Sequence, residues 1–197
     1  DFTLDMDELR TVLEEDKSMR LVTVTHASNV TGTVTPVEEI GRLCKEKGVA
    51  LCVDGAQAAP HRKVDVEALG ADYYIFSGHK MLGPTGTGVL WMREENLEPL
   101  FLGGGMVESV SDDSFVPAAG YAKYEAGTPN VSGGIGLGAA VDYLENVGMD
   151  AVSARERKLT DLLIDGLEKI EAIPRTRSPL PRSEVSIVSS TLEWNGP

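Results

Sequence analysis

The chain has 197 residues, of which 42% are hydrophobic and 25% charged, a composition typical of a soluble globular domain with one substantial core. Its 31 acidic residues outnumber its 18 lysines and arginines, and the net charge of −13 argues against binding to nucleic acid, because phosphates would be repelled. No apolar run approaches the roughly 20 residues that a membrane helix needs. Residues 1–5 also lack the plan of a signal peptide, so we expect a cytoplasmic protein that binds no membrane.

The first predicted elements are a helix over residues 6–15, where apolar residues recur on one face, and a strand over residues 20–25. A parallel sheet normally starts with a strand, so this order indicates that the chain begins partway through a larger domain. The strand is followed by a polar loop at residues 26–33, which carries Asn29.

A second helix is predicted to end near Lys47, just before Gly48. Its start has the pattern of a capped helix, in which Thr35 is the cap, Pro36 is the first helical residue and Glu38 follows three residues after the cap. The all-apolar residues 49–53 then predict a strand that is buried on both faces.

Asp54 and Gln57 follow the carboxyl end of that strand. The next predicted elements are a short helix and two strands, at residues 66–69, 72–76 and 88–92. Strands that alternate with helices or loops indicate an α/β fold, with a three-layer, mostly parallel sheet flanked by helices.

The second half of the chain is less regular. Residues 103–120 show little periodicity and are predicted to form a long functional loop or a hairpin. Two helices are predicted over residues 132–147 and 151–170. Residues 174–197 are rich in proline, arginine and serine, with one strand-like run at residues 185–188.

The two cysteines, Cys44 and Cys52, fall in a predicted helix and a predicted strand. Neither has the exposed, electropositive loop setting that produces a reactive thiolate. We therefore interpret both as small buried apolar residues in a reducing compartment, and predict neither a disulfide nor a metal site.

Polar side chains follow the carboxyl ends of three predicted strands, which share one edge of a parallel sheet. They are Asn29, the pair Asp54 and Gln57, and the trio Ser77, His79 and Lys80. Ligands of open α/β sheets bind at that edge. Pyridoxal 5′-phosphate needs a lysine amine for its aldehyde, a carboxylate for its pyridine nitrogen, and donors for its phenolic oxygen and its phosphate. The set predicts a site for this cofactor.

Each residue on its own has a plainer explanation. A carboxylate such as Asp54 after a strand can cap a helix, and residues such as Asn29, Ser77 and Thr128 can stabilise turns. A lysine, a glutamine or a histidine in a loop, such as Lys80, Gln57 or His79, can be merely solvated or packed. The prediction of a cofactor site therefore depends on the complete set in its order.

The order of these motifs resembles that of class V aminotransferase-fold enzymes, which depend on pyridoxal phosphate. The stretch 53–57, Val-Asp-Gly-Ala-Gln, precedes Ser-Gly-His-Lys at 77–80 and Gly-Pro-Thr-Gly at 83–86. Further matching motifs lie at residues 28–33 and 125–130, and the similarity spans residues 4–170. Within the group, the chain most resembles Suf-type cysteine desulfurases and selenocysteine lyases.

The resemblance implies a role for each candidate residue. By position, Lys80 would be the Schiff-base lysine, Asp54 the partner of the pyridine nitrogen, Gln57 and Asn29 the groups around the phenolic oxygen, Ser77 and His79 phosphate ligands, and Thr128 a ligand to the phosphate of the neighbouring subunit's cofactor. The family pattern therefore implies a homodimer with its sites at the interface.

The activity implied is that of a cysteine desulfurase, which converts L-cysteine to L-alanine and enzyme-bound sulfur for iron–sulfur cluster assembly, with a possible sulfur-acceptor protein. Three family groups have no counterpart here: a histidine that stacks on the cofactor, a sulfur-accepting cysteine and a carboxylate-binding arginine. The resemblance thus makes residues 1–173 part of a cofactor-binding large domain, and residues 174–197 the start of a small domain or a frayed tail.

Two alternatives remain open. The chain could belong to a class V aminotransferase or related lyase, or it could be a truncated cofactor domain without turnover. An incomplete parallel sheet would expose edges and apolar surface, so we expect marginal stability or dependence on partner chains.

Overall fold

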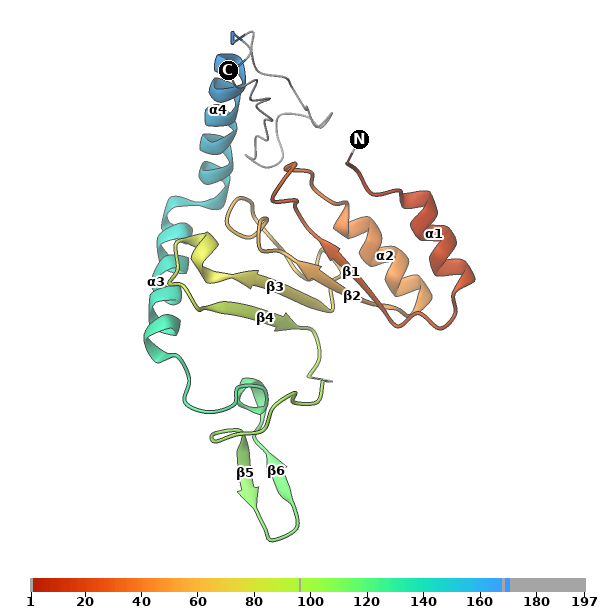
Figure 1. Ribbon diagram of the computed structural model, residues 1–197, viewed down its shortest axis with the longest axis vertical. Coiled ribbons are helices and arrows are strands. Elements are labelled where there is room, and N and C mark those ends of the chain that lie inside the picture. The colour runs from red at the N-terminus through yellow and green to blue at the C-terminus, as the bar shows by residue number, and fades with distance from the viewer. Residues whose placement is uncertain (1, 96, 168, 171–197) are drawn as a thin grey trace, which may run out of the picture.

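The computed structural model describes residues 2–95, 97–167 and 169–170, and it contains one four-stranded sheet (Figure 1). The strands are β1 (Leu21–Thr25), β2 (Ala50–Asp54), β3 (Tyr73–Ser77) and β4 (Gly88–Met92), in the order β1-β2-β3-β4. β1 pairs with β2, and β2 with β3, in parallel, whereas β3 and β4 are antiparallel. The predicted α/β fold with a mostly parallel sheet is confirmed.

The antiparallel pairing of β4 follows from the length of its connection. Only residues 78–87 separate β3 from β4, and they include a single short helix, η1 (Gly78–Met81). A parallel crossover needs a dozen or more residues, usually with a full helix, so this connection can only turn the chain back. Ser77 at the end of β3 therefore pairs with Gly88 at the start of β4.

Helices α1 (Met6–Glu15) and α2 (Val37–Lys47) pack with one face of the sheet to form the core. Ile40 of α2, Leu51 and Val53 of β2 and Tyr74 of β3 are almost fully buried in it. The alternation of side chains along each strand turns the neighbouring positions to the other face. There Leu21, Ile75 and Leu90 are each more than two-fifths exposed.

The start of α2 differs from the prediction. Pro36 occupies the N-cap position and no side chain caps the helix. The hydroxyl of Thr35 instead donates a hydrogen bond of 2.6 Å to the carbonyl oxygen of Thr25 at the end of β1. A tertiary partner has thus replaced the predicted local cap, and it closes the loop that leaves β1.

The predicted helix at 66–69 is wrong. Residues 66–70 form a hydrogen-bonded turn, in which Asp65 Oδ1 accepts hydrogen bonds from the backbone N–H groups of Glu67 and Ala68. Gly70 then adopts a left-handed conformation with φ of 69°, which ends the turn before a helix can propagate. The turn leads the chain into β3.

The second half of the chain forms a hairpin and two longer helices. The hairpin pairs β5 (Val107–Val110) with β6 (Phe115–Pro117), and a short helix η2 (Gly120–Lys123) follows it. Of the two structures predicted for residues 103–120, a loop or a hairpin, the chain forms the hairpin, which projects from the sheet in Figure 1. Helices α3 (Val131–Val147) and α4 (Met149–Leu167) complete the described chain.

The tail predicted at 174–197, with its strand-like run, lies outside the described residues. Among the helices that are described, none combines the length and the apolar character needed to cross a membrane.

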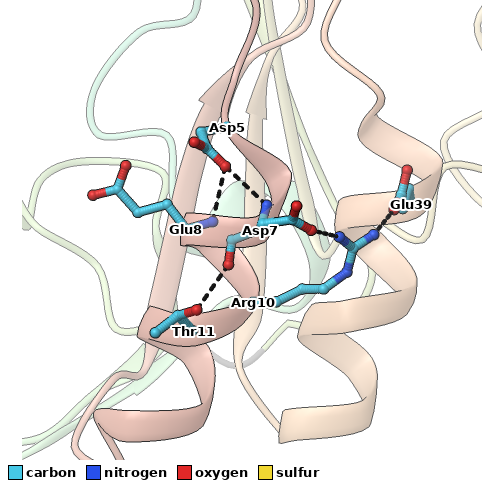
Figure 2. Close-up of polar contacts among 6 residues, drawn as sticks. All are labelled: Asp5, Asp7, Glu8, Arg10, Thr11 and Glu39. Atoms are coloured by element: carbon cyan, nitrogen blue, oxygen red, sulfur yellow. Dashed lines mark hydrogen bonds and ion pairs between the residues drawn. The ribbon is translucent and has the colours of Figure 1, made fainter.

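Polar contacts at the start of α1 join it to α2 (Figure 2). Asp5 caps α1, because its carboxylate accepts hydrogen bonds from the backbone N–H groups of Asp7 and Glu8 at 3.0 and 2.9 Å. Arg10 forms ion pairs with Asp7 in the same helix and with Glu39 in α2. These groups remain in contact with solvent, so we expect Leu13, which is buried beneath them, to contribute more to stability.

We predict that Leu13→Ala lowers the free energy of unfolding by about 2–5 kcal/mol, because it leaves a cavity beside α2. Arg10→Gln should lower it by less than about 1 kcal/mol, because exposed ion pairs contribute little. Urea unfolding followed by circular dichroism measures both. A larger loss for Arg10→Gln than for Leu13→Ala would contradict this account of how α1 is held.

Candidate functional site

The parallel register places the ends of three strands side by side. Thr25 of β1 lies opposite Asp54 of β2, and Asp54 lies opposite Ile75 of β3. The segments that follow these strands begin at the same edge of the sheet. Six of the seven predicted site residues are in or directly after these strand ends: Asn29, Asp54, Gln57, Ser77, His79 and Lys80.

Asp54 is exposed at the centre of this edge. One carboxylate oxygen, Oδ1, accepts a hydrogen bond of 2.9 Å from the N–H of Ala56, while Oδ2 has no hydrogen-bond partner among the described residues. The N–H groups of Ala58 and Ala59 then donate to the carbonyl oxygen of Gly55 in a tight turn. This turn holds Gln57, which is half-buried, next to Asp54 in the chain.

Lys80 lies in η1, three residues after the end of β3. Both Lys80 and His79 are exposed, and within the described part of the chain the amine of Lys80 has no hydrogen bond and no ion pair. Leu82 ends η1 in a left-handed conformation with φ of 67°, which is uncommon for a residue with a side chain and costs roughly 1–2 kcal/mol. Such strain is often found at functional sites.

Helix α3 packs closely against the loop that carries Lys80. A Cβ atom at Gly136 would lie 2.5 Å from Cγ of Pro84, and one at Gly83 would lie 2.9 Å from Cδ1 of Leu137. The close approach thus leaves no room for a side chain at Gly136, while Gly83 is also confined by the carbonyl oxygen of Gly78 at 2.8 Å from such a Cβ. The pattern of α3 alone does not predict this contact, although the spacing of Gly133 and Gly136 on one helical face points to a close neighbour.

Thr128, the seventh predicted residue, does not follow one of these three strands. It lies in the exposed segment between η2 and α3, where the N–H of Gly127 donates a hydrogen bond of 2.8 Å to the carbonyl oxygen of Gly104.

A buried polar pair lies directly behind the edge. Nδ1 of His26 and the phenolic oxygen of Tyr74 are 2.9 Å apart, and both side chains are less than 5% exposed. Burial, with a smaller effect of the Arg62 charge, lowers the pKa of His26 to about 4. Burial also raises the pKa of Tyr74. The pair is therefore neutral at physiological pH, and its partners, 48 residues apart, cannot be matched from the sequence.

Of the two cysteines predicted to be buried, Cys44 is buried, whereas Cys52 is only partly buried. Cys44 is buried, and burial together with the charge of Asp72 raises its thiol pKa to about 11. The pKa of Cys52 is also raised, by burial and by the charge of Asp54. Neither thiol favours the thiolate that a nucleophile needs. Within the described residues, no cluster of three or more His, Cys, Asp or Glu side chains could hold a metal ion.

A groove of about 430 Å³ lies at the opposite end of the sheet, near the start of β2 and β3. Lys45, Glu67, Tyr73 and Arg93 are among the residues that line it, and none of the predicted site residues does. The described candidate site is thus an open sheet edge, and the groove lies away from it.

Residues 1–194 match the family described as Aminotransferase class-V. The chain belongs to this family. Membership confirms the resemblance seen in the motifs at 53–57 and 77–80. The match to the class-V family thus covers nearly all of the 197 residues.

Curated relatives of this class-V chain have names of cysteine desulfurases. A probable cysteine desulfurase of Xylella fastidiosa is 47% identical over 174 residues, which cover 87% of this chain and 41% of the relative. A cysteine desulfurase of Cronobacter sakazakii is 41% identical over 196 residues, which cover 98% of this chain and 47% of the relative.

Two solved structures that this chain resembles are also named cysteine desulfurases. The apo structure of a cysteine desulfurase from Thermococcus onnurineus aligns with a TM-score of 0.90 at 37% identity, over 98% of this chain and 48% of the other. A cysteine desulfurase of Escherichia coli aligns with a TM-score of 0.83 at 36% identity, over 93% of this chain and 46% of the other. The chain therefore spans less than half the length of these relatives.

Membership of the class-V family implies pyridoxal phosphate, and the donor set at the edge fits this cofactor. The amine of Lys80 and Oδ2 of Asp54 lack partners among the described residues, and the same is true of the side chains of Gln57 and Ser77, although both are half-buried. Half-buried polar groups without partners are normally satisfied by a ligand or by water. Amine, carboxylate, amide and hydroxyl are the groups that the cofactor requires.

We predict that Gly136→Ala lowers the free energy of unfolding by about 1–3 kcal/mol, because the added methyl group overlaps Pro84 in the lysine loop. Gly138→Ala is the matched control: the same helix has open space there, so this change should raise the free energy by up to about 1 kcal/mol. Both are measured by urea unfolding. Equal effects of the two substitutions would show that α3 does not support the loop.

We predict a loss of stability on acidification that depends on His26. Its pKa, near 6.5 when unfolded, is about 4 in the fold, so the unfolded chain binds more protons between these values. Stability contributed by neutral His26 is complete above about pH 6.5 and falls by up to about 3 kcal/mol as the pH approaches 4. The free energy of unfolding, measured at pH 7 and pH 4 for wild type and His26→Gln, tests this. The loss should be smaller in the variant, and equal losses would contradict it.

Proposed function

We propose that the chain is the cofactor-binding part of a pyridoxal-phosphate-dependent cysteine desulfurase, which converts L-cysteine to L-alanine and enzyme-bound sulfur. The observation that carries the proposal is the delivery of Lys80 and Asp54 by neighbouring parallel strands to one exposed edge. The names of the relatives support the choice of cysteine as substrate.

In this proposal each residue has a defined task. Lys80 would hold the cofactor covalently through its amine, and its free amine would be the base that takes a proton from the substrate. Asp54 would hold the pyridine nitrogen and favour its protonated form, because an opposite charge nearby stabilises a cation. The bound cofactor supplies an electron sink for the bond that is cleaved.

The remaining polar groups orient the cofactor. Asn29 and Gln57 are proposed to contact its phenolic oxygen, and Ser77 and His79 its phosphate. Because η1 has only four residues, the phosphate contacts are assigned to these side chains and not to the N–H groups at the start of the helix. Thr128 is proposed to reach the cofactor of a second subunit in a homodimer.

Two parts of the desulfurase reaction are not accounted for by the described residues. A sulfur-accepting thiol needs a low pKa, whereas the pKa values of Cys44 and Cys52 are raised. The edge is also open to solvent, so further chain or a partner subunit would have to close it. A cytoplasmic location and a sulfur-acceptor protein remain predictions of the same proposal.

We predict that the whole protein containing this chain binds pyridoxal phosphate with visible absorbance and releases sulfide from L-cysteine in the presence of a thiol. Lys80→Ala should remove the absorbance and lower sulfide release by at least about a thousandfold, because the covalent anchor and the base are lost together. Lys158→Ala, at an exposed position of α4, is the control and should change neither.

The alternatives give different results in the same assay. Amino transfer to a keto acid without sulfide release would favour a class-V aminotransferase. Absorbance with neither reaction would favour a cofactor domain without turnover. Absorbance that survives Lys80→Ala would exclude Lys80 as the anchor and contradict the site itself.

A further inference from the structure

The pair formed by His26 and Tyr74 spans the strand that carries Asp54. His26 follows β1 and Tyr74 lies in β3, and the sheet order places β2 between them. Their hydrogen bond of 2.9 Å and their edge-to-face ring contact, with centroids 6.0 Å apart, therefore join the two neighbours of β2. Such a link restrains the three strand ends together.

Both partners also contact β2 at the Asp54–Gly55 peptide. The N–H of His26 donates a hydrogen bond of 2.8 Å to the carbonyl oxygen of Asp54. A Cβ atom at Gly55 would lie 2.1 Å from Cε1 and Cζ of Tyr74 and 2.2 Å from its hydroxyl oxygen, so the backbone of Gly55 lies directly against the phenol. The Asp54–Gly55 backbone is thus in contact with both members of the pair.

The same pair supports the loop of Asn29. The carbonyl oxygen of His26 accepts a hydrogen bond of 2.9 Å from the N–H of Thr35, which closes the loop at its base. The N–H of Ser28 donates a hydrogen bond of 2.9 Å to the carbonyl oxygen of Thr33, so a second hydrogen bond joins the two sides of the loop. Movement of His26 would therefore displace Asn29 together with Asp54.

We propose that His26 and Tyr74 are positioning residues, which hold the Asp54 carboxylate and the Asn29 loop in place for the cofactor. This inference rests on the proposed function, since it assigns the pair to the same site. His26 and Tyr74 need not touch the cofactor, because they act through the backbone of Asp54 and Gly55.

The charges around the pair agree with this role. Arg62 and Asp54 are the charged groups whose fields reach it: Arg62 lowers the pKa values of both members, and Asp54 raises that of Tyr74. Because His26 and Tyr74 are themselves neutral, they add no charge that would compete with the cofactor for Asp54. A charged support at this depth would also have to be desolvated, at a considerable cost.

The test compares cofactor binding and cofactor titration in Tyr74→Phe and in Tyr143→Phe, where the latter removes a hydroxyl from an exposed position of α3. Pyridoxal phosphate is added to the apo form of the whole protein, and visible absorbance gives its dissociation constant. The pH midpoint of the absorbance change is then measured for the bound cofactor. A hydrogen bond that merely stabilised the fold would change the melting temperature without changing this midpoint.

We expect Tyr74→Phe to weaken cofactor binding about tenfold and to lower the pH midpoint by about half a unit, because a displaced carboxylate stabilises the cationic cofactor less. Tyr143→Phe should match wild type in both measurements. Wild-type affinity and midpoint in Tyr74→Phe would overturn the proposal, whatever the melting temperature.

A second pair of variants gives the same comparison without changing Tyr74. His26→Asn keeps a hydrogen-bonding atom at the δ position and should bind the cofactor within about threefold of wild type, while His26→Leu should lose about tenfold or more. Equal affinities in these two variants would overturn the proposal. If wild type itself bound no cofactor, the proposed function would fail, whereas binding that is insensitive to these changes would refute only the positioning role.

Discussion

The parallel register of β1, β2 and β3 is the constraint on which the rest of the structure depends. It aligns Thr25, Asp54 and Ile75, so that every segment leaving these strands starts from one edge. The register is fixed by burial, because Leu51 and Val53 must face the core beneath α2. A slip of one residue would turn Asp54 into that core and Val53 out to solvent. Burying an unpaired carboxylate costs more free energy than a single packing contact contributes.

The edge is assembled from opposite kinds of residue on its two sides. In front, polar side chains such as those of Lys80 and Asp54 are exposed and lack full partners among the described residues. Behind, the His26–Tyr74 pair is buried and hydrogen-bonded, and α3 packs on the lysine loop through its glycines. A site that must hold a ligand rigidly needs this combination of free groups and a supported backbone. The described residues thus place exposed polar groups on a backbone that is held by packing and hydrogen bonds.

The strands, and the positions of Asp54 and Lys80 at or after their ends, could be predicted from the sequence because their signals are local. The apolar run at 49–53 predicts β2 and therefore the place of Asp54, and the glycine-rich stretch after β3 predicts the loop of Lys80. Features that depend on distant partners could not be predicted. Thr35 donates to Thr25 rather than capping α2, and the partner of His26 lies 48 residues away.

The central claim is that Lys80 is the covalent anchor of the cofactor, and peptide mapping tests it most directly. The protein is incubated with pyridoxal phosphate, reduced with borohydride and digested, and the peptides are analysed by mass spectrometry. Reduction makes the bond between lysine and cofactor permanent, so the label reports its site. We expect the added mass on the peptide that contains Lys80, and on no other lysine in stoichiometric amount. Stoichiometric label on a different lysine, or none in a protein with visible cofactor absorbance, would contradict the account.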